Sequence, residues 1–152
     1  DTKASSSPTR TVIAFGISGG ANSNVIEYIT TASVGNATDF GNLTVARYGA
    51  ASASSSVRAL FFGGGNYTNV IDYVTIASAG NASDFGDLQA GSSQGGACSS
   101  NVRAVANKSS SSASSNLYYV TIATTGNSAT FGNLAVNVNR TCATSINHGG
   151  LQ

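Results

Sequence analysis

The segment Asn24-Val25-Ile26-Glu27-Tyr28 returns 45 positions later as Asn69-Val70-Ile71-Asp72-Tyr73. The residues that follow repeat as well, because 24–43 and 69–88 agree at 14 of 20 positions without a gap. A third copy follows at an offset of 46, and its residues 119–134 match 73–88 at 10 of 16 positions. Self-similarity at a fixed period of this length indicates a repeat architecture. The sequence therefore predicts one repeat domain over 1–152, with repeats at about 8–56, 57–101 and 102–146.

Each copy predicts four short strands separated by turn residues. The first strand opens with an arginine, the second is rich in β-branched and aromatic residues, the third centres on Phe-Gly, and the fourth holds small residues. In the first copy these strands are expected near 10–15, 25–31, 40–45 and 48–54. No stretch shows the 3.6-residue apolar period of a helix. The expected fold class is therefore all-β, with three tandem four-stranded repeats.

Composition limits the partners that the chain can bind. Charged residues make up 9% of the sequence and the formal net charge is +1, which excludes the strong positive field of a duplex nucleic-acid binder. No apolar run is long enough for a transmembrane helix, and the first residues lack the apolar core of a signal peptide. Cys98 and Cys142 form neither a metal motif nor a disulfide framework; they are expected as free thiols or as one disulfide between neighbouring repeats. We expect no nucleic acid and no membrane insertion.

The repeated motifs resemble a known family. An arginine strand ending in Phe-Gly-Gly-Gly, then Asn-x-Ile-[Asp/Glu]-Tyr, then Gly-Asn-Ala-x-Asp-Phe-Gly is similar to the kelch-like repeat arrays of tailed-phage structural and fibre proteins, especially of aquatic phages. The resemblance covers nearly the whole chain and is strongest in the first two copies. The third copy departs at Lys108–Ser115, Tyr118 and Thr130.

The kelch resemblance implies β-propeller blades. Closed propellers have about 4–8 blades, so three repeats imply that two chains complete one ring, that the chain belongs to a longer array, or that the fold is different. The alternative is a β-trefoil, which also has three four-stranded repeats and closes within one chain. Fold analogy of this kind does not determine function.

The sequence predicts no enzyme, no catalytic residue, no metal and no cofactor. His148 is the single histidine, and a Ser-His-Asp arrangement would need a carboxylate to hold it. The acids Glu27 and Asp72 occupy the same position in successive repeats, as do Asp39 and Asp84. Recurring acids are expected to cap turns or to accept hydrogen bonds between repeats, because an active site would be a single departure from the period.

Nine repeated residues are expected to be structural. The arginines should tie adjacent repeats together, the tyrosines should pack between repeats, and the phenylalanines should be buried. These residues are Arg10, Arg58, Arg103, Tyr28, Tyr73, Tyr119, Phe40, Phe85 and Phe131. Tyr67 breaks the period; with Asn66 and Thr68 at a loop tip, it is the expected glycan contact.

These features favour a non-enzymatic structural or adhesion protein of a virion or another extracellular assembly, such as a fibre, tail or capsid-decoration subunit. A stand-alone lectin-like carbohydrate-binding module is the alternative. The segment 140–146 parallels 47–53 without a following repeat. The expected partners are therefore further copies of the chain, meeting through the two ends as a homo-oligomer, or other proteins of the assembly.

Overall fold

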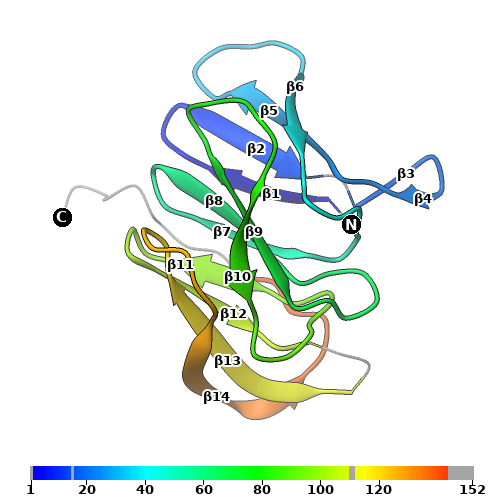
Figure 1. The fold of residues 1–152 in the computed structure, drawn as a ribbon, viewed down its shortest axis with the longest axis vertical. Coiled ribbons are helices and arrows are strands. Elements are labelled where there is room, and N and C mark those ends of the chain that lie inside the picture. The colour runs from blue at the N-terminus through cyan, green and yellow to red at the C-terminus, as the bar shows by residue number, and fades with distance from the viewer. Residues whose placement is uncertain (1, 15, 110–111, 144–152) are drawn as a thin grey trace.

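The computed structural model describes residues 2–14, 16–109 and 112–143, and their regular structure is entirely antiparallel β (Figure 1). The first sheet orders β1 (Lys3–Ser6), β2 (Arg10–Ala14), β5 (Val25–Thr30) and β6 (Thr38–Asn42). The second orders β7 (Ala51–Ser54), β8 (Arg58–Phe62), β9 (Val70–Thr75) and β10 (Ser83–Asp87). The third orders β11 (Ala97–Ser99), β12 (Arg103–Asn107), β13 (Ser114–Thr121) and β14 (Ala129–Val138). A hairpin of β3 (Ile17–Ser18) and β4 (Ala21–Asn22) extends from the first sheet.

The all-β prediction is confirmed. No helix in the described ranges has the length and apolar character needed to cross a membrane. Each four-stranded sheet follows chain order, and no closed barrel occurs among the described strands. The β-trefoil alternative, whose strands would close a barrel, does not fit this arrangement.

The expected position of the small-residue strand within its sheet is wrong. Residues 48–54 were expected to end the first four-stranded unit. Instead, β7 pairs with β8, Ala51 lying opposite Phe62, and so begins the second sheet. In the same way β11 pairs with β12 and begins the third sheet. The sheets therefore run from 3 to 42, 51 to 87 and 97 to 138.

The repeated Phe-Gly pair marks a β-bulge in the last strand of each sheet. The pairing registers shift at Phe40, Phe85 and Phe131, and in each case the next residue is a glycine with φ between 142° and 153°. A bulge inserts an extra residue and bends the strand, and the positive φ that follows favours glycine. The same pair thus produces the same bend in all three sheets.

Two apolar clusters lie between the sheets. One joins Val12, Ile26, Phe40 and Leu43 of the first sheet and its following loop to Ala59, Phe61, Val74 and Ile76 of the second. The other joins Leu60, Ile71, Phe85 and Leu88 to Ala104, Ala106, Val120 and Ile122 of the third. The two clusters use equivalent positions, so one packing mode is repeated along the stack of sheets that Figure 1 shows.

The first strands of the three sheets approach one another most closely. The Ser52 hydroxyl donates to the Ala4 carbonyl at 3.0 Å, and the Ser99 hydroxyl donates to the Ser54 carbonyl at 2.6 Å. Packed sheets usually lie about 10 Å apart, but the Ala and Ser side chains of β1, β7 and β11 allow a closer approach. The three sheets therefore converge along one edge, which these strands form.

Candidate functional site

Every sheet carries the same cluster of arginine, tyrosine and phenylalanine. The guanidinium carbon lies over the tyrosine ring, at 4.2 Å from its centroid in the first sheet, 4.7 Å in the second and 4.5 Å in the third. The tyrosine meets the phenylalanine edge to face, with centroids 5.9, 5.8 and 6.1 Å apart. Both contacts are favourable geometries for aromatic rings. The clusters are Arg10–Tyr28–Phe40, Arg58–Tyr73–Phe85 and Arg103–Tyr119–Phe131.

The first two arginines also bind the following sheet. Arg10 donates to the carbonyls of Ile76 and Ala77 at 3.1 and 3.0 Å. Arg58 donates to the carbonyls of Ile122 and Ala123, both at 2.9 Å. Charged donors make strong hydrogen bonds, so each guanidinium fastens its sheet to the next. Arg103 has the same tyrosine beneath it, but no equivalent carbonyl is available to it among the described residues.

A second repeated contact joins the last strand of each sheet to a turn of the next sheet. The Gly80 amide donates to the Phe40 carbonyl at 2.7 Å, and Asn81 Oδ1 accepts from the Asn42 amide at 3.0 Å. One sheet further on, the Gly126 amide donates to the Phe85 carbonyl at 2.7 Å. Asn127 Oδ1 accepts from the Asp87 amide at 2.9 Å. The sequence predicted turn residues between the strands, but it did not predict this inter-sheet contact.

Each sheet thus has two different faces. The front face of a sheet is defined by the positions that Val12, Ile26, Phe40 and Leu43 occupy in the first sheet and the loop after it. The back face is defined by the positions that Ala59, Phe61, Val74 and Ile76 occupy in the second sheet and the residue after β9. The front face of the first sheet packs on the back face of the second, and the front face of the second packs on the back face of the third.

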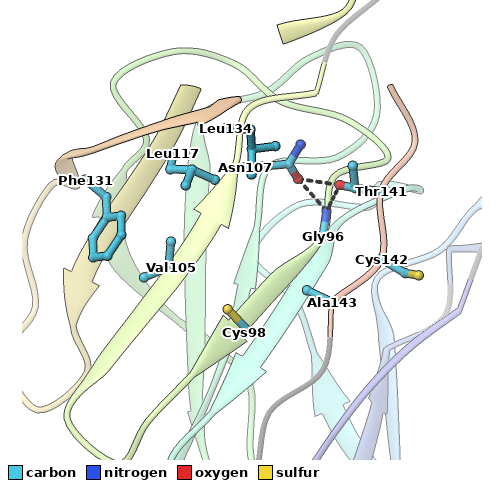
Figure 2. Close-up of a pocket in the computed structure, with 10 residues that line it drawn as sticks. All are labelled: Gly96, Cys98, Val105, Asn107, Leu117, Phe131, Leu134, Thr141, Cys142 and Ala143. Atoms are coloured by element: carbon cyan, nitrogen blue, oxygen red, sulfur yellow. Dashed lines mark hydrogen bonds between the residues drawn. The ribbon is translucent and has the colours of Figure 1, made fainter. Parts of the chain in front are cut away.

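The front face of the third sheet is open. Its equivalent residues are Val105, Leu117, Phe131 and Leu134, and they line a groove of about 370 Å³ (Figure 2). Phe40 and Phe85 are each 2% exposed, as predicted, but Phe131 is 50% exposed. The prediction that Phe131 is buried is therefore wrong. Its bulge and its tyrosine contact are intact, but no described sheet lies in front of it.

The far end of the groove is closed by the last described residues. Thr141 Oγ1 donates to Asn107 Oδ1 at 2.6 Å and accepts from the Gly96 amide at 2.9 Å, as the dashed lines in Figure 2 show. Cys98 and Cys142, both free thiols, line the groove with Ala143. Most of the lining is apolar side chain, which suits a hydrophobic partner better than a polar ligand.

The back face of the first sheet is the other open surface. Its residues Thr11, Ile13 and Ile29 are equivalent to Ala59, Phe61 and Val74 of the second sheet. All three are partly exposed, whereas their equivalents in the second sheet are 0–3% exposed. Strand alternation places them opposite buried Val12 and Ala14. The stack therefore ends in two unlike surfaces, a front face on the third sheet and a back face on the first.

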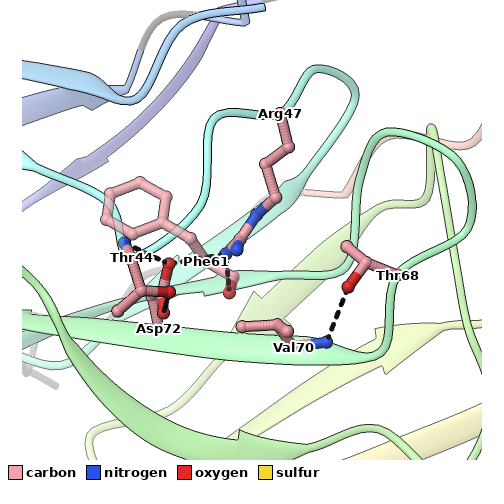
Figure 3. A network of polar contacts seen from close by, with 6 residues as sticks. All are labelled: Thr44, Arg47, Phe61, Thr68, Val70 and Asp72. Carbon is pink, nitrogen blue, oxygen red and sulfur yellow. Dashed lines mark hydrogen bonds and ion pairs between the residues drawn. The ribbon is translucent and has the colours of Figure 1, made fainter.

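A buried ion pair crosses the interface between the first and second sheets (Figure 3). Arg47 Nη2 lies 3.0 Å from Asp72 Oδ2, and the two side chains are 2% and 0% exposed. Asp72 also accepts from the Thr44 hydroxyl at 2.6 Å and from the Thr44 amide at 3.2 Å, and Arg47 donates to the Phe61 carbonyl at 3.3 Å. Burial lowers the pKa of Arg47 below its ordinary value, and the charge of Asp72 opposes this effect. The pair fixes the relative position of the two sheets and is closed to solvent.

The predicted glycan loop, residues 66–68, does not line the groove on the third sheet. Asn66 and Tyr67 are exposed, Tyr67 at 48%, and Tyr67 has a φ of 58°. The Thr68 hydroxyl accepts from the Val70 amide at 3.3 Å (Figure 3), and its own amide donates to the Gly64 carbonyl at 3.0 Å. The loop therefore holds a tyrosine ring in an accessible position on an ordered turn.

The remaining candidates are dispersed. Asp72 accepts hydrogen bonds across the sheet interface, whereas Glu27 is partly exposed on the open back face. His148 lies outside the described residues. No group of three or more His, Cys, Asp or Glu that could hold a metal ion occurs in residues 2–14, 16–109 and 112–143.

Arg47 was missed in the sequence because it follows the repeated strands in an irregular segment.

No protein-family model and no curated protein matches this chain.

Proposed function

We propose that the chain is a non-enzymatic structural or adhesion subunit of an extracellular assembly, such as the fibre, tail or decoration layer of a virus particle. The observation that carries this proposal is the repeated sheet interface, which leaves one front face and one back face open at opposite ends of the stack. Stacked units with unsatisfied terminal faces are suited to assembly. The kelch-like motifs of the sequence support a place among phage structural proteins.

In this proposal the three sheets are propeller blades. Each is a four-stranded meander, and the sheets converge along β1, β7 and β11, as blades converge on the axis of a propeller. The small side chains and the hydroxyl-to-carbonyl bonds of these strands suit an inner position. The outer strands are linked through Gly-Asn turns.

Fractionation of the source material tests the assembly role. An antibody against the recombinant chain is used on separated particles, secreted protein and cell lysate, followed by immunogold electron microscopy of the particles. We expect the label on particles or another extracellular structure. Recovery of the protein only as a dissolved intracellular species would contradict the proposal.

A lectin-like module is the second candidate function, and the exposed Tyr67 loop favours it. Aromatic rings bind sugars by stacking, and the side chains of Asn66 and Thr68 supply polar groups beside the ring. The test is a glycan array probed with the wild-type chain and with Tyr67→Ala. Binding that is lost in the variant supports a surface-glycan partner, with Tyr48→Ala as the control tyrosine outside the loop. The absence of any bound glycan would leave assembly as the remaining role.

A further inference from the structure

We propose that two copies of this chain join head to tail, the front face of the third sheet of each copy packing on the back face of the first sheet of the other, to close a ring of six sheets. This inference rests on the proposed assembly function and names the partner as a second copy of the chain. It concerns the open groove of Figure 2 and the surface around Ile13.

The apolar side chains fit this pairing because the chain makes the same contact twice within itself. In the second sheet, the front-face residues Leu60, Ile71 and Phe85 are buried against the back face of the third sheet. The equivalent residues of the third sheet are Val105, Leu117 and Phe131. The first sheet offers the only other unpaired back face in the described part of the chain, with Ile13 at the position of Phe61. A front face and a back face are complementary, so the contact is heterologous.

The polar groups of the two open faces also correspond. Arg103 is exposed and already lies over Tyr119, the arrangement in which Arg10 and Arg58 reach carbonyls of the next sheet. The equivalent carbonyls on a second copy belong to Thr31 and Ala32. The Arg103 guanidinium could therefore donate to these carbonyls of a docked copy while it stays stacked on Tyr119.

The Gly-Asn turn supplies the second polar match. Gly35-Asn36-Ala37 has the same sequence as Gly80-Asn81-Ala82, which binds the last strand of the first sheet. A side-chain carbon added at Gly41 or Gly86 would collide with the next sheet's turn, whereas one added at Gly132 meets no described atom within 4 Å. The space beside Gly132 is therefore open for a turn of the Gly35 type.

The number of copies follows from ring closure. Closed propellers contain about 4–8 blades, and the described residues of this chain supply three four-stranded sheets per copy. Six is the single multiple of three within that range, so two copies complete the ring with two identical interfaces. Threonines at 11 and 31 replace the apolar residues Ala59 and Ile76 of the internal back face. The contact between copies is consequently weaker than the contact within a chain, and dimers should dissociate on dilution.

Sedimentation velocity over a wide range of protein concentration tests the proposal. The wild-type chain should reach twice the mass of one chain. Ile13→Lys and Phe131→Lys each place a charge on one open face, and each should weaken self-association at least tenfold. Val57→Lys is the matched control, because Val57 is 58% exposed but lies in the second sheet's hairpin, away from both open faces; it should associate as the wild type does.

Mixing the two variants identifies the geometry. Each retains one intact face, so an equimolar mixture of Ile13→Lys and Phe131→Lys should form a one-to-one dimer although neither associates alone. If two front faces paired with each other instead, Ile13→Lys would still dimerise and the mixture would contain no heterodimer. Either of those results overturns the proposal.

Separate controls test whether the variants fold and whether a second copy of the chain covers the open faces. Circular dichroism confirms that each variant keeps the wild-type spectrum, and Arg103→Glu replaces Phe131→Lys if the latter fails to fold. If the wild-type chain remains monomeric at all concentrations, a second copy does not cover the open faces and the proposal is overturned. A further unit of a longer chain would then be the partner of these faces. Loss of association on deleting residues 144–152, with Phe131→Lys still dimeric, overturns it as well. A dimer that is absent from particles and other extracellular structures contradicts the proposed function but not the head-to-tail contact.

Discussion

Phe85 and Phe131 have the same local structure and different surroundings. Both occupy a bulge, precede a positive-φ glycine and meet a tyrosine edge to face, yet one is 2% exposed and the other 50%. Local sequence determines the conformation of the pair, and the presence of a neighbouring sheet determines burial.

This contrast gives a matched pair of substitutions. Phe85→Ala should lower the free energy of unfolding by ~3–5 kcal/mol, the range for a buried phenylalanine, because it leaves a cavity between two sheets. Phe131→Ala should cost less than ~1 kcal/mol in the monomer, since its ring is half in solvent. Chemical denaturation at a concentration that keeps the chain monomeric measures both. Equal losses would mean that the third sheet's front face is covered in the monomer.

The buried ion pair gives a second prediction. Asp72→Ala should destabilise the fold by ~3–5 kcal/mol, because it leaves the Arg47 charge buried and unpaired. Arg47 Nε and Nη1 already lack a hydrogen-bond partner among the described residues, so Phe61 O is the one contact left to the guanidinium.

The double variant Arg47→Met, Asp72→Leu separates charge from packing. It should recover most of the loss, because apolar residues of similar volume remove the cost of desolvating two charges. Denaturation midpoints for the wild type, the single variant and the double variant make the comparison. A double variant as unstable as Asp72→Ala would show that the pair's hydrogen bonds to Thr44 and Phe61 dominate.

Repetition in the sequence made many residue positions predictable. It placed Phe40 and Phe85 in the core correctly, because residues one period apart share an environment in the middle of a stack. It failed at Phe131 because a period contains no information about where the stack ends. It also could not find the Arg47–Asp72 contact, which pairs an irregular segment with a strand and has no counterpart at the other interface among the described residues.

At the scale of the element, the Phe-Gly bulge is the feature that joins strand geometry to sheet stacking. Gly86 has a φ of 142° and its missing Cβ faces the backbone of Gly126, whereas Gly132 has a φ of 153° and no described atom within 4 Å of that point. Both glycines relieve backbone strain, but only the first also permits close approach of the next sheet.

Alanine at these two glycines should therefore differ in effect. Gly86→Ala should cost ~2–4 kcal/mol, from strain at positive φ together with displacement of the turn at 126–128. Gly132→Ala should cost ~1–2 kcal/mol, from strain alone. Thermal and denaturant unfolding of the two variants measure the difference. In the dimer proposed above, Gly132→Ala should additionally weaken association.

The order of strands within each sheet shows what a repeat leaves undetermined. The four strand segments were recognisable from β-branched runs, glycine breaks and the Phe-Gly pair. However, a cyclic repeat can be cut at any point, and the sequence contains nothing that assigns Ala51–Ser54 to the preceding or the following sheet. Pairing with β8 decides it, because the three-residue Ser55–Val57 connection is short enough for a hairpin.

At the scale of the whole molecule, three sheets joined by one interface type leave two complementary ends. A sheet inside the stack is stabilised by burial against neighbours on both faces, whereas each terminal sheet has one neighbouring sheet among the described residues. Phe131 and Ile13 lie on the two open faces at the positions of Phe85 and Phe61, which are buried in the second sheet, and for this reason they serve as the tests of association.

Association of the folded chain should make thermal stability depend on protein concentration. A partner that binds the native state and not the unfolded chain stabilises it by mass action. Each tenfold rise in concentration should therefore raise the wild-type Tm by roughly 2 °C for a chain of this size. Ile13→Lys and Phe131→Lys should each have a Tm that does not change with concentration, and Val57→Lys should follow the wild type. Differential scanning calorimetry of the four proteins over a broad concentration series makes the measurement. If the wild-type Tm did not depend on concentration, the native chain would be a monomer whose two open faces remain exposed to solvent.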